Sequence, residues 1–112
     1  MKLTTFLSVT LQAITITSTF ACLETTGTIS NTGVPGGIET IDNGLTTCNS
    51  DWGWRIDQDG HVSLNCLSGY IYAVTLDASM AWYRNPVEAF SFTQAASTGG
   101  DIIWWDDFYF GC

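Results

Sequence analysis

The stretch Trp52–Cys66, WGWRIDQDGHVSLNC, decides the fold class of this chain. Apolar side chains alternate with polar ones on both sides of an Asp-Gln-Asp-Gly segment, which is the pattern of a β-hairpin. A three-residue loop, Gln58–Gly60, sets Ile56 opposite Val62. The resulting register places six apolar side chains on one face: Trp52, Trp54, Ile56, Val62, Leu64 and Cys66.

A two-residue loop, Asp59-Gly60, would instead mix apolar and polar side chains on each face of the hairpin. The three-residue loop is preferred because it needs a left-handed residue at its end, where Gly60 stands. With this register Trp52 and Trp54 are expected in the core. The polar face then carries Arg55, Asp57, His61, Ser63 and Asn65.

The rest of the mature chain also favours short strands over helices. Residues 22–37 are rich in Thr, Gly, Asn and Ser, so they are expected to be loop-like and the least ordered part. Residues 87–94 fit either a strand or a short helix capped at Asn85, and the alternation Phe90-Ser-Phe92 favours the strand. Other expected strands lie at 38–42, 70–76, 81–83 and 101–110, with a loop at 98–100. We therefore predict a mainly β protein, a small antiparallel β-sandwich or barrel of five to six strands.

Residues 1–21 have the pattern of a secretory signal peptide. Lys2 is followed by an uncharged apolar run up to Ala21, and Thr19-Phe20-Ala21 places small residues at the positions that signal peptidase reads. The run is too short and too rich in threonine for a membrane span. We expect cleavage after Ala21, a single secreted domain at residues 22–112, and an extracellular location.

The four cysteines, Cys22, Cys48, Cys66 and Cys112, fit two disulfide bonds in an exported domain of about ninety residues. A lipoprotein acylated at Cys22 would leave an odd number of cysteines. A straight strand would place Cys48 roughly 13 Å from Cys66, so that bond requires a bend at residues 49–51. All three connectivities stay open.

After cleavage, two arginines face eleven acidic residues, a formal charge of −9. Nucleic acids and anionic membranes are bound by Lys and Arg, so both are unexpected as partners. A protein surface or a neutral glycan remains as the expected partner. The sequence leaves the oligomeric state undetermined.

The candidate contact surface is the run Trp104-Trp105-Asp106-Asp107 near the C-terminus. Adjacent residues of a strand point to opposite faces, so one of the two tryptophans is expected to be exposed beside a carboxylate. Exposed tryptophan near Asp or Asn is a platform on which sugar rings stack, although a small domain also uses tryptophan to fill its core.

No motif indicates catalysis, a metal or a cofactor. Asp57-Gln-Asp59-Gly60 resembles the start of a calcium loop but lacks the later glutamate, so a turn is favoured and His61 is expected to be a solvated turn residue. Asp106 and Asp107, or Glu88 with either, would form a glycosidase pair only on one face, whereas neighbours on a strand face opposite ways. We expect no enzyme activity.

The signal peptide, acidic domain and C-terminal Cys112 together resemble the small secreted cysteine-containing proteins of filamentous fungi, among which many plant-infection effectors are found. This resemblance implies an extracellular protein that acts by binding a host or partner macromolecule.

A second resemblance is to cyanovirin-type lectin domains, and it implies carbohydrate binding. It is carried by the order Cys48, Ile56, Gly60, Val62-x-Leu64-x-Cys66, Leu76-Asp77, Asn85 and Phe90-x-Phe92. The chain departs from that family in a long first spacing, a missing glycine between Asn85 and Phe90, and the lack of a twofold repeat.

Overall fold

The computed structural model describes residues 22–109, which form β-strands and turns with no helix among them. The expected signal peptide at 1–21 and Cys112 lie outside the described residues. The nine strands described are β1 (Leu23–Ser30), β2 (Pro35–Asp42), β3 (Leu45–Ile56), β4 (Val62–Cys66), β5 (Ile71–Val74), β6 (Met80–Arg84), β7 (Ala89–Thr93), β8 (Ser97–Gly99) and β9 (Ile102–Tyr109).

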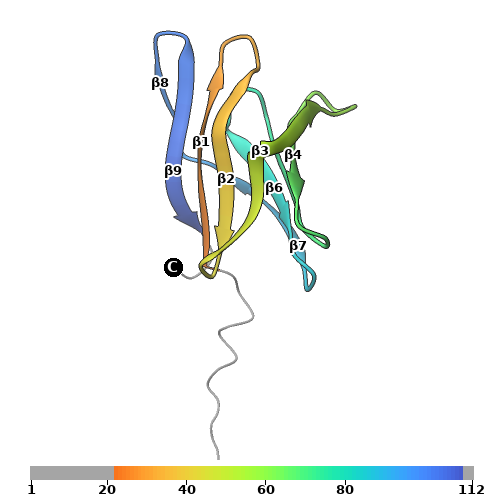
Figure 1. The fold of residues 1–112 in the computed structure, drawn as a ribbon. Coiled ribbons are helices and arrows are strands. Elements are labelled where there is room, and N and C mark those ends of the chain that lie inside the picture. Colours follow the sequence, from red (N-terminus) through yellow and green to blue (C-terminus); the bar gives the residue numbers. More distant parts are fainter. Residues whose placement is uncertain (1–21, 110–112) are drawn as a thin grey trace, which may run out of the picture.

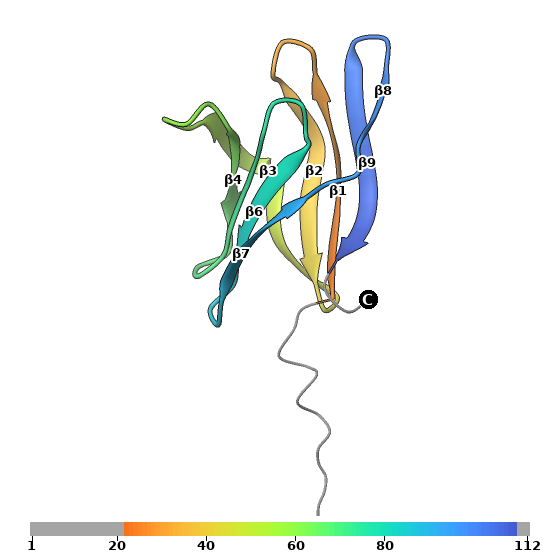
Figure 2. The ribbon, with the colours of Figure 1, turned by 180° about the vertical axis from the view of Figure 1, so that it is seen from behind.

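All nine strands belong to one antiparallel sheet in the order β7-β6-β5-β4-β3-β2-β1-β9-β8. The sheet curls into a half-barrel (Figure 1). Its two edge strands, β7 and β8, follow each other in the chain, and the link between them crosses from one edge to the other (Figure 2). The mainly β, antiparallel prediction is confirmed, but five to six strands were too few, and a single curled half-barrel sheet is present in place of the predicted sandwich or closed barrel.

The prediction that residues 22–37 are loop-like is wrong, because β1 and the start of β2 occupy most of that range. Alternate residues of β1 are buried, including Thr25 and Gly27. A Cβ at Gly27 would lie 2.7 Å from the Cα of Ile38, so only glycine allows this approach of β1 to β2. The inward face of β1 therefore lacks the apolar alternation by which strands are recognised.

The β3–β4 hairpin has the predicted loop. Ile56 pairs with Val62 and Trp54 with Leu64, and the backbone N–H of Asp57 donates to the His61 carbonyl at 2.9 Å. Gly60 has a φ of 81°, as the three-residue loop requires.

Farther from the turn, the predicted register is wrong. Cys66 lies opposite Cys48, where Trp52 was expected, because residues 50–53 have no partner in the ladder and bulge out of β3. The bulge is the bend that a Cys48–Cys66 bond was expected to need, and that disulfide is present with a Cα–Cα distance of 4.0 Å. The Asn65 side-chain amide donates to the Trp52 carbonyl at 2.8 Å and holds the bulge in place.

This is the only disulfide that the structure places between two described cysteines, whereas two were predicted. Cys22 is not a free thiol, and the fourth cysteine, Cys112, lies outside the described residues.

The outer part of the hairpin, residues 51–61, projects from the sheet, and we call it the arm (Figure 1). β2 pairs with β3 only as far as Asn49, so the arm has strand β4 as its one neighbour in the sheet. The prediction that Trp52 and Trp54 are core residues is therefore wrong, and they are 45% and 40% exposed.

The concave side is filled by large side chains and by polar groups that bond to one another. Tyr72 and Tyr83 are the largest fully buried side chains. Gln94, in the β7–β8 link, accepts hydrogen bonds at Oε1 from Tyr72 (2.8 Å) and Thr25 (3.1 Å). Its amide donates to the Ala78 carbonyl at 3.1 Å. The link is thereby fastened to β1 and β5, on opposite walls of the half-barrel.

The other expected strands are present. β5, β6 and β9 lie within or close to the predicted ranges, and residues 89–93 form strand β7 where a short helix was the alternative. The Asn85 side chain accepts from the backbone N–H groups of Val87 and Glu88 at 2.9 Å, so it stabilises a turn. The predicted loop at 98–100 is in part the short strand β8.

Candidate functional site

Strand β9 separates the four residues of the predicted contact surface. Trp104 is 44% exposed and Trp105 is 3% exposed. Asp106 shares the outer, convex face with Trp104, whereas Asp107 lies on the inner face with Trp105 and is half-buried. The structure thus brings together Trp104 and Asp106 and separates them from Trp105 and Asp107.

Trp105 has a structural role. Its indole N–H donates to the Thr25 hydroxyl at 2.6 Å, and Thr25 in turn donates to Gln94. This side chain belongs to the buried polar chain that fastens the β7–β8 link. Trp105 is therefore not part of the exposed contact surface.

On the outer face of β9, Trp104 is followed toward one end by Ile102 and toward the other, beyond Asp106, by Phe108. We call these three apolar side chains the β9 stripe: Ile102, Trp104 and Phe108. All three side chains lie on the outer face of β9, and Phe108 is 58% exposed. Sequence reasoning missed Ile102 and Phe108, although a period of two residues counted from Trp104 reaches both.

Glycine on the neighbouring edge strand positions the Trp104 ring. A Cβ at Gly99 of β8 would lie 2.9 Å from the indole, so the ring lies directly against the β8 backbone. Any larger residue at position 99 would push the ring away from β8. The local sequence thus keeps a flat aromatic surface at the edge of the sheet.

On its other side, the stripe is bordered by polar residues of β1. Ser30 pairs with Ile102, Thr28 with Trp104, and Glu24 with Phe108. Directly paired residues of antiparallel strands share a face, so hydroxyls and carboxylates line the stripe along its length. Neither of the two described arginines, Arg55 on β3 and Arg84 on β6, belongs to the strands that build this surface. The surface therefore carries three apolar side chains, with the Asp106 carboxylate between Trp104 and Phe108, and it is neutral to acidic at its border.

The hydrogen bonds of the Asp57 side chain are those of a turn. The Asp57 carboxylate accepts from the backbone N–H groups of Asp59 and His61, each at 3.0 Å. Side-chain atoms of these three residues that are able to bind a metal lie within 4.8 Å of one another. The calcium-loop resemblance therefore has a structural explanation in the carboxylate that closes the turn.

His61 differs from the expected solvated residue. Its ring stacks on Trp82 with centroids 4.5 Å apart and an interplanar angle of 15°. The contact joins the turn of the arm to strand β6.

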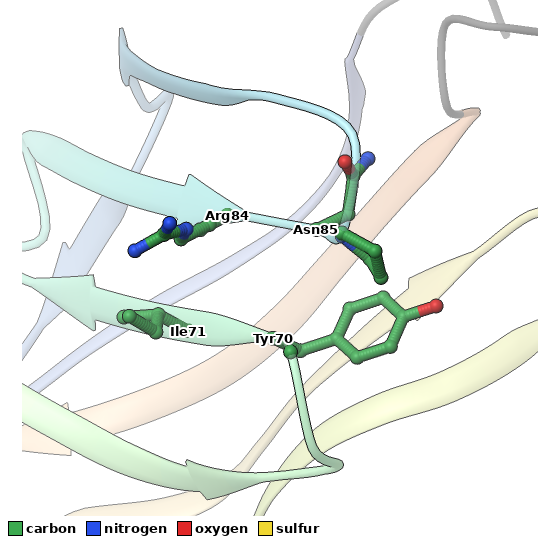
Figure 3. Close-up of a pocket in the computed structure, with 6 residues that line it drawn as sticks. Tyr70, Ile71, Arg84 and Asn85 are labelled. Carbon is green, nitrogen blue, oxygen red and sulfur yellow. The ribbon is translucent and has the colours of Figure 1, made fainter.

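Two shallow hollows adjoin on the convex face of β5, β6 and β7, where sequence reasoning indicated no site. The first has a volume of about 330 Å³ and lies at the turns before β5 and after β6; Figure 3 shows Tyr70, Ile71, Arg84 and Asn85 around it. The second, of about 430 Å³, we call the Arg84 hollow. It is lined by Ile71, Trp82, Tyr83, Arg84, Ala89, Phe90 and Ser91.

Asp106 and Asp107 point to opposite faces of β9, so they do not form the carboxylate pair of a glycosidase. Glu88 lies in the turn before β7.

In the described part of the chain, no helix has the length and apolar character needed to cross a membrane. Comparisons of the chain with protein-family models, with curated proteins and with solved structures find no match.

Proposed function

We propose that this chain is a secreted interaction protein, effector-like and without enzyme activity, that binds a partner macromolecule outside the cell through the β9 stripe. The observation that carries the proposal is the exposed row Ile102, Trp104 and Phe108 on a convex face. Small molecules are held in concave sites that surround most of their surface. A convex apolar row with a polar border is typical of macromolecular interfaces.

The acidic charge limits the class of partner. The described residues include eleven carboxylates and two arginines, so a polyanion would be repelled. A neutral or basic surface that offers apolar side chains to Trp104 fits this stripe best.

The alternative function is carbohydrate binding at the same place. Trp104 lies on the same face as Asp106, and Thr28 pairs with it from β1. A sugar ring stacked on the indole would find hydrogen-bonding groups on both sides. This alternative needs Trp104 but does not need Ile102.

A photo-reactive residue placed at 108 tests the proposal, and the same residue at 54 is the control, since Trp54 is also exposed but lies on the arm. The purified variants are irradiated on candidate host tissue. We expect a discrete cross-linked product from position 108 only. Unlabelled wild-type protein should compete for it, and Trp104→Ala should compete at least 10-fold less well, as expected for a central aromatic contact.

Equal products from positions 54 and 108, or none from either across several hosts, would contradict the proposal. A glycan array distinguishes the alternative. Binding at millimolar sugar that is lost in Trp104→Ala and kept in Ile102→Ala would favour the carbohydrate function over the protein partner.

A further inference from the structure

The two edges of the sheet differ in how open they are. β8 has three residues, whereas β7 pairs with β6 over five residues without a bulge. β7 contains no charged residue and no proline, the features by which natural edge strands prevent pairing with other chains.

The hydrogen-bonding pattern shows which residues of β7 face away from the sheet. Gln94 donates its backbone N–H to the Ser79 carbonyl, and Asn85 donates its own to the Glu88 carbonyl. Positions 88, 90, 92 and 94 therefore bond toward β6, because bonded pairs alternate along an antiparallel ladder. Ala89, Ser91 and Thr93 direct their backbone N–H and C=O groups outward, and all three residues are exposed.

The Arg84 hollow lies beside this edge. Ala89 and Ser91 are small and form its low outer border, while Ile71 and Trp82 give it apolar walls. The hollow is thus open toward any strand that pairs with β7.

Arg84 supplies an unused charge in the hollow. Its guanidinium makes no ion pair or hydrogen bond with another described residue, although eleven described residues are acidic. A guanidinium beside an apolar wall is suited to a carboxylate carried on an apolar stem.

We propose that the free edge of β7 binds an extended segment of a partner protein as an added antiparallel strand, with a glutamate side chain of that segment lying over Ala89 and Ser91 and its carboxylate on Arg84. Added strands gain affinity from backbone hydrogen bonds and specificity from hollows that receive alternate side chains. An added strand would lie about 10 Å from β6, two strand spacings away. A glutamate and an arginine side chain that face each other span this distance.

A second copy of this chain fits the edge less well. In a β7–β7 pairing, the outward residues would be Ala89, Ser91 and Thr93 again, which are short and uncharged. They would leave the hollow unfilled and Arg84 without a carboxylate. Two copies of an acidic chain also repel each other.

The test is selection of a displayed library of random nine-residue peptides against the purified protein. We expect enriched peptides with alternating β-branched residues and a glutamate. Ser91→Pro should weaken their binding at least 10-fold, because it removes an outward N–H without removing a hydrogen bond to β6. Ser91→Thr is the matched control, since it keeps the N–H, and it should bind within 2-fold of wild type.

Arg84→Gln should weaken the glutamate peptides at least 5-fold and leave their glutamine versions unchanged. Circular dichroism and thermal unfolding establish that each variant folds. Trp104→Ala should leave peptide binding unchanged, so failure at this edge is distinguishable from failure of the β9 stripe.

Three results would overturn the proposal: no enrichment over an unselected library, peptide binding that Ser91→Pro leaves intact, or a concentration-dependent dimer that Ser91→Pro abolishes. The last result, measured by light scattering on the eluting protein, would assign the edge to a second copy.

Discussion

The interior around Gln94 buries polar side chains, whereas the arm at residues 51–61 exposes large apolar ones. In the interior, Gln94 and Thr25 are buried, and Gln94 accepts hydrogen bonds from both Thr25 and Tyr72. On the arm, the large apolar side chains Trp52, Trp54 and Ile56 are exposed.

The difference follows from the neighbours that each region has, because a side chain is buried by the strands around it. The β7–β8 link crosses the concave side and covers Thr25, so a polar residue is buried there and must be bonded internally. The arm pairs with β4 alone in the sheet, so its apolar residues are only partly covered. In this curled sheet, whether a residue lies beneath the β7–β8 link decides its burial more than its residue type does.

The same substitution, glutamine to leucine, should have very different effects on stability in the two regions. Gln94→Leu leaves the Tyr72 hydroxyl, the Thr25 hydroxyl and the Ala78 carbonyl without their buried partner. At about 1–3 kcal/mol for each unsatisfied group, we expect the free energy of unfolding to fall by at least about 3 kcal/mol.

Gln58→Leu, at the exposed tip of the arm, is the matched control and should change stability by about 0.5 kcal/mol or less. Urea unfolding followed by tryptophan fluorescence measures both variants. Equal losses would refute the view that Gln94 closes the half-barrel.

The disulfide at the base of the arm gives the next largest effect. Cys48 and Cys66 are 18 residues apart, and a bond that closes a loop of this size contributes about 3 kcal/mol. The double variant Cys48→Ser, Cys66→Ser should lose that amount. Removing the bond should accelerate backbone hydrogen exchange more on the arm than on β1 and β9. Equal acceleration of all three would contradict a local role for the bond.

The tyrosines on the concave side predict a dependence on alkaline pH. Burial raises the pKa of the Tyr72 hydroxyl well above its ordinary value of 10.0, and burial also raises the pKa of Tyr83. Each stays protonated in the folded chain while the unfolded chain ionises. The contribution of these two tyrosines to the free energy of unfolding is therefore fully present below about pH 10 and is lost as the pH rises above it.

The expected slope is at most about 1.4 kcal/mol per pH unit for each tyrosine. Tyr72→Phe loses one hydrogen bond, which lowers the free energy of unfolding by the same amount at every pH. Its free energy of unfolding should nevertheless decline less steeply between pH 10 and 11 than that of the wild type. The free energy of unfolding from urea titrations at each pH measures this slope. Parallel curves for the variant and the wild type would count against it.

Sequence reasoning found the elements whose apolar pattern is local. The hairpin loop, β5, β6 and β9 follow from alternation and from Gly60. It missed β1 because Thr25 and Gly27 face inward for reasons that lie elsewhere in the chain, at Gln94 and Ile38.

The candidate site was predictable to a similar extent. Alternation along β9 required that Trp104 and Trp105 separate, but which of them is buried depends on Thr25, 80 residues away along the chain. The burial assigned to Trp52 and Trp54 failed because no local pattern shows that β2 stops pairing at Asn49.

The pairing of β1 with β9 also determines when the protein is able to fold. The first described strand finds one of its two neighbours only in the last one, Leu23 opposite Tyr109. A chain emerging from the ribosome therefore cannot complete the sheet until strand β9 has been synthesised. Contacts of such sequence separation are formed slowly, so β1, with its buried residue Thr25, stays unpaired on one side while the central hairpins form.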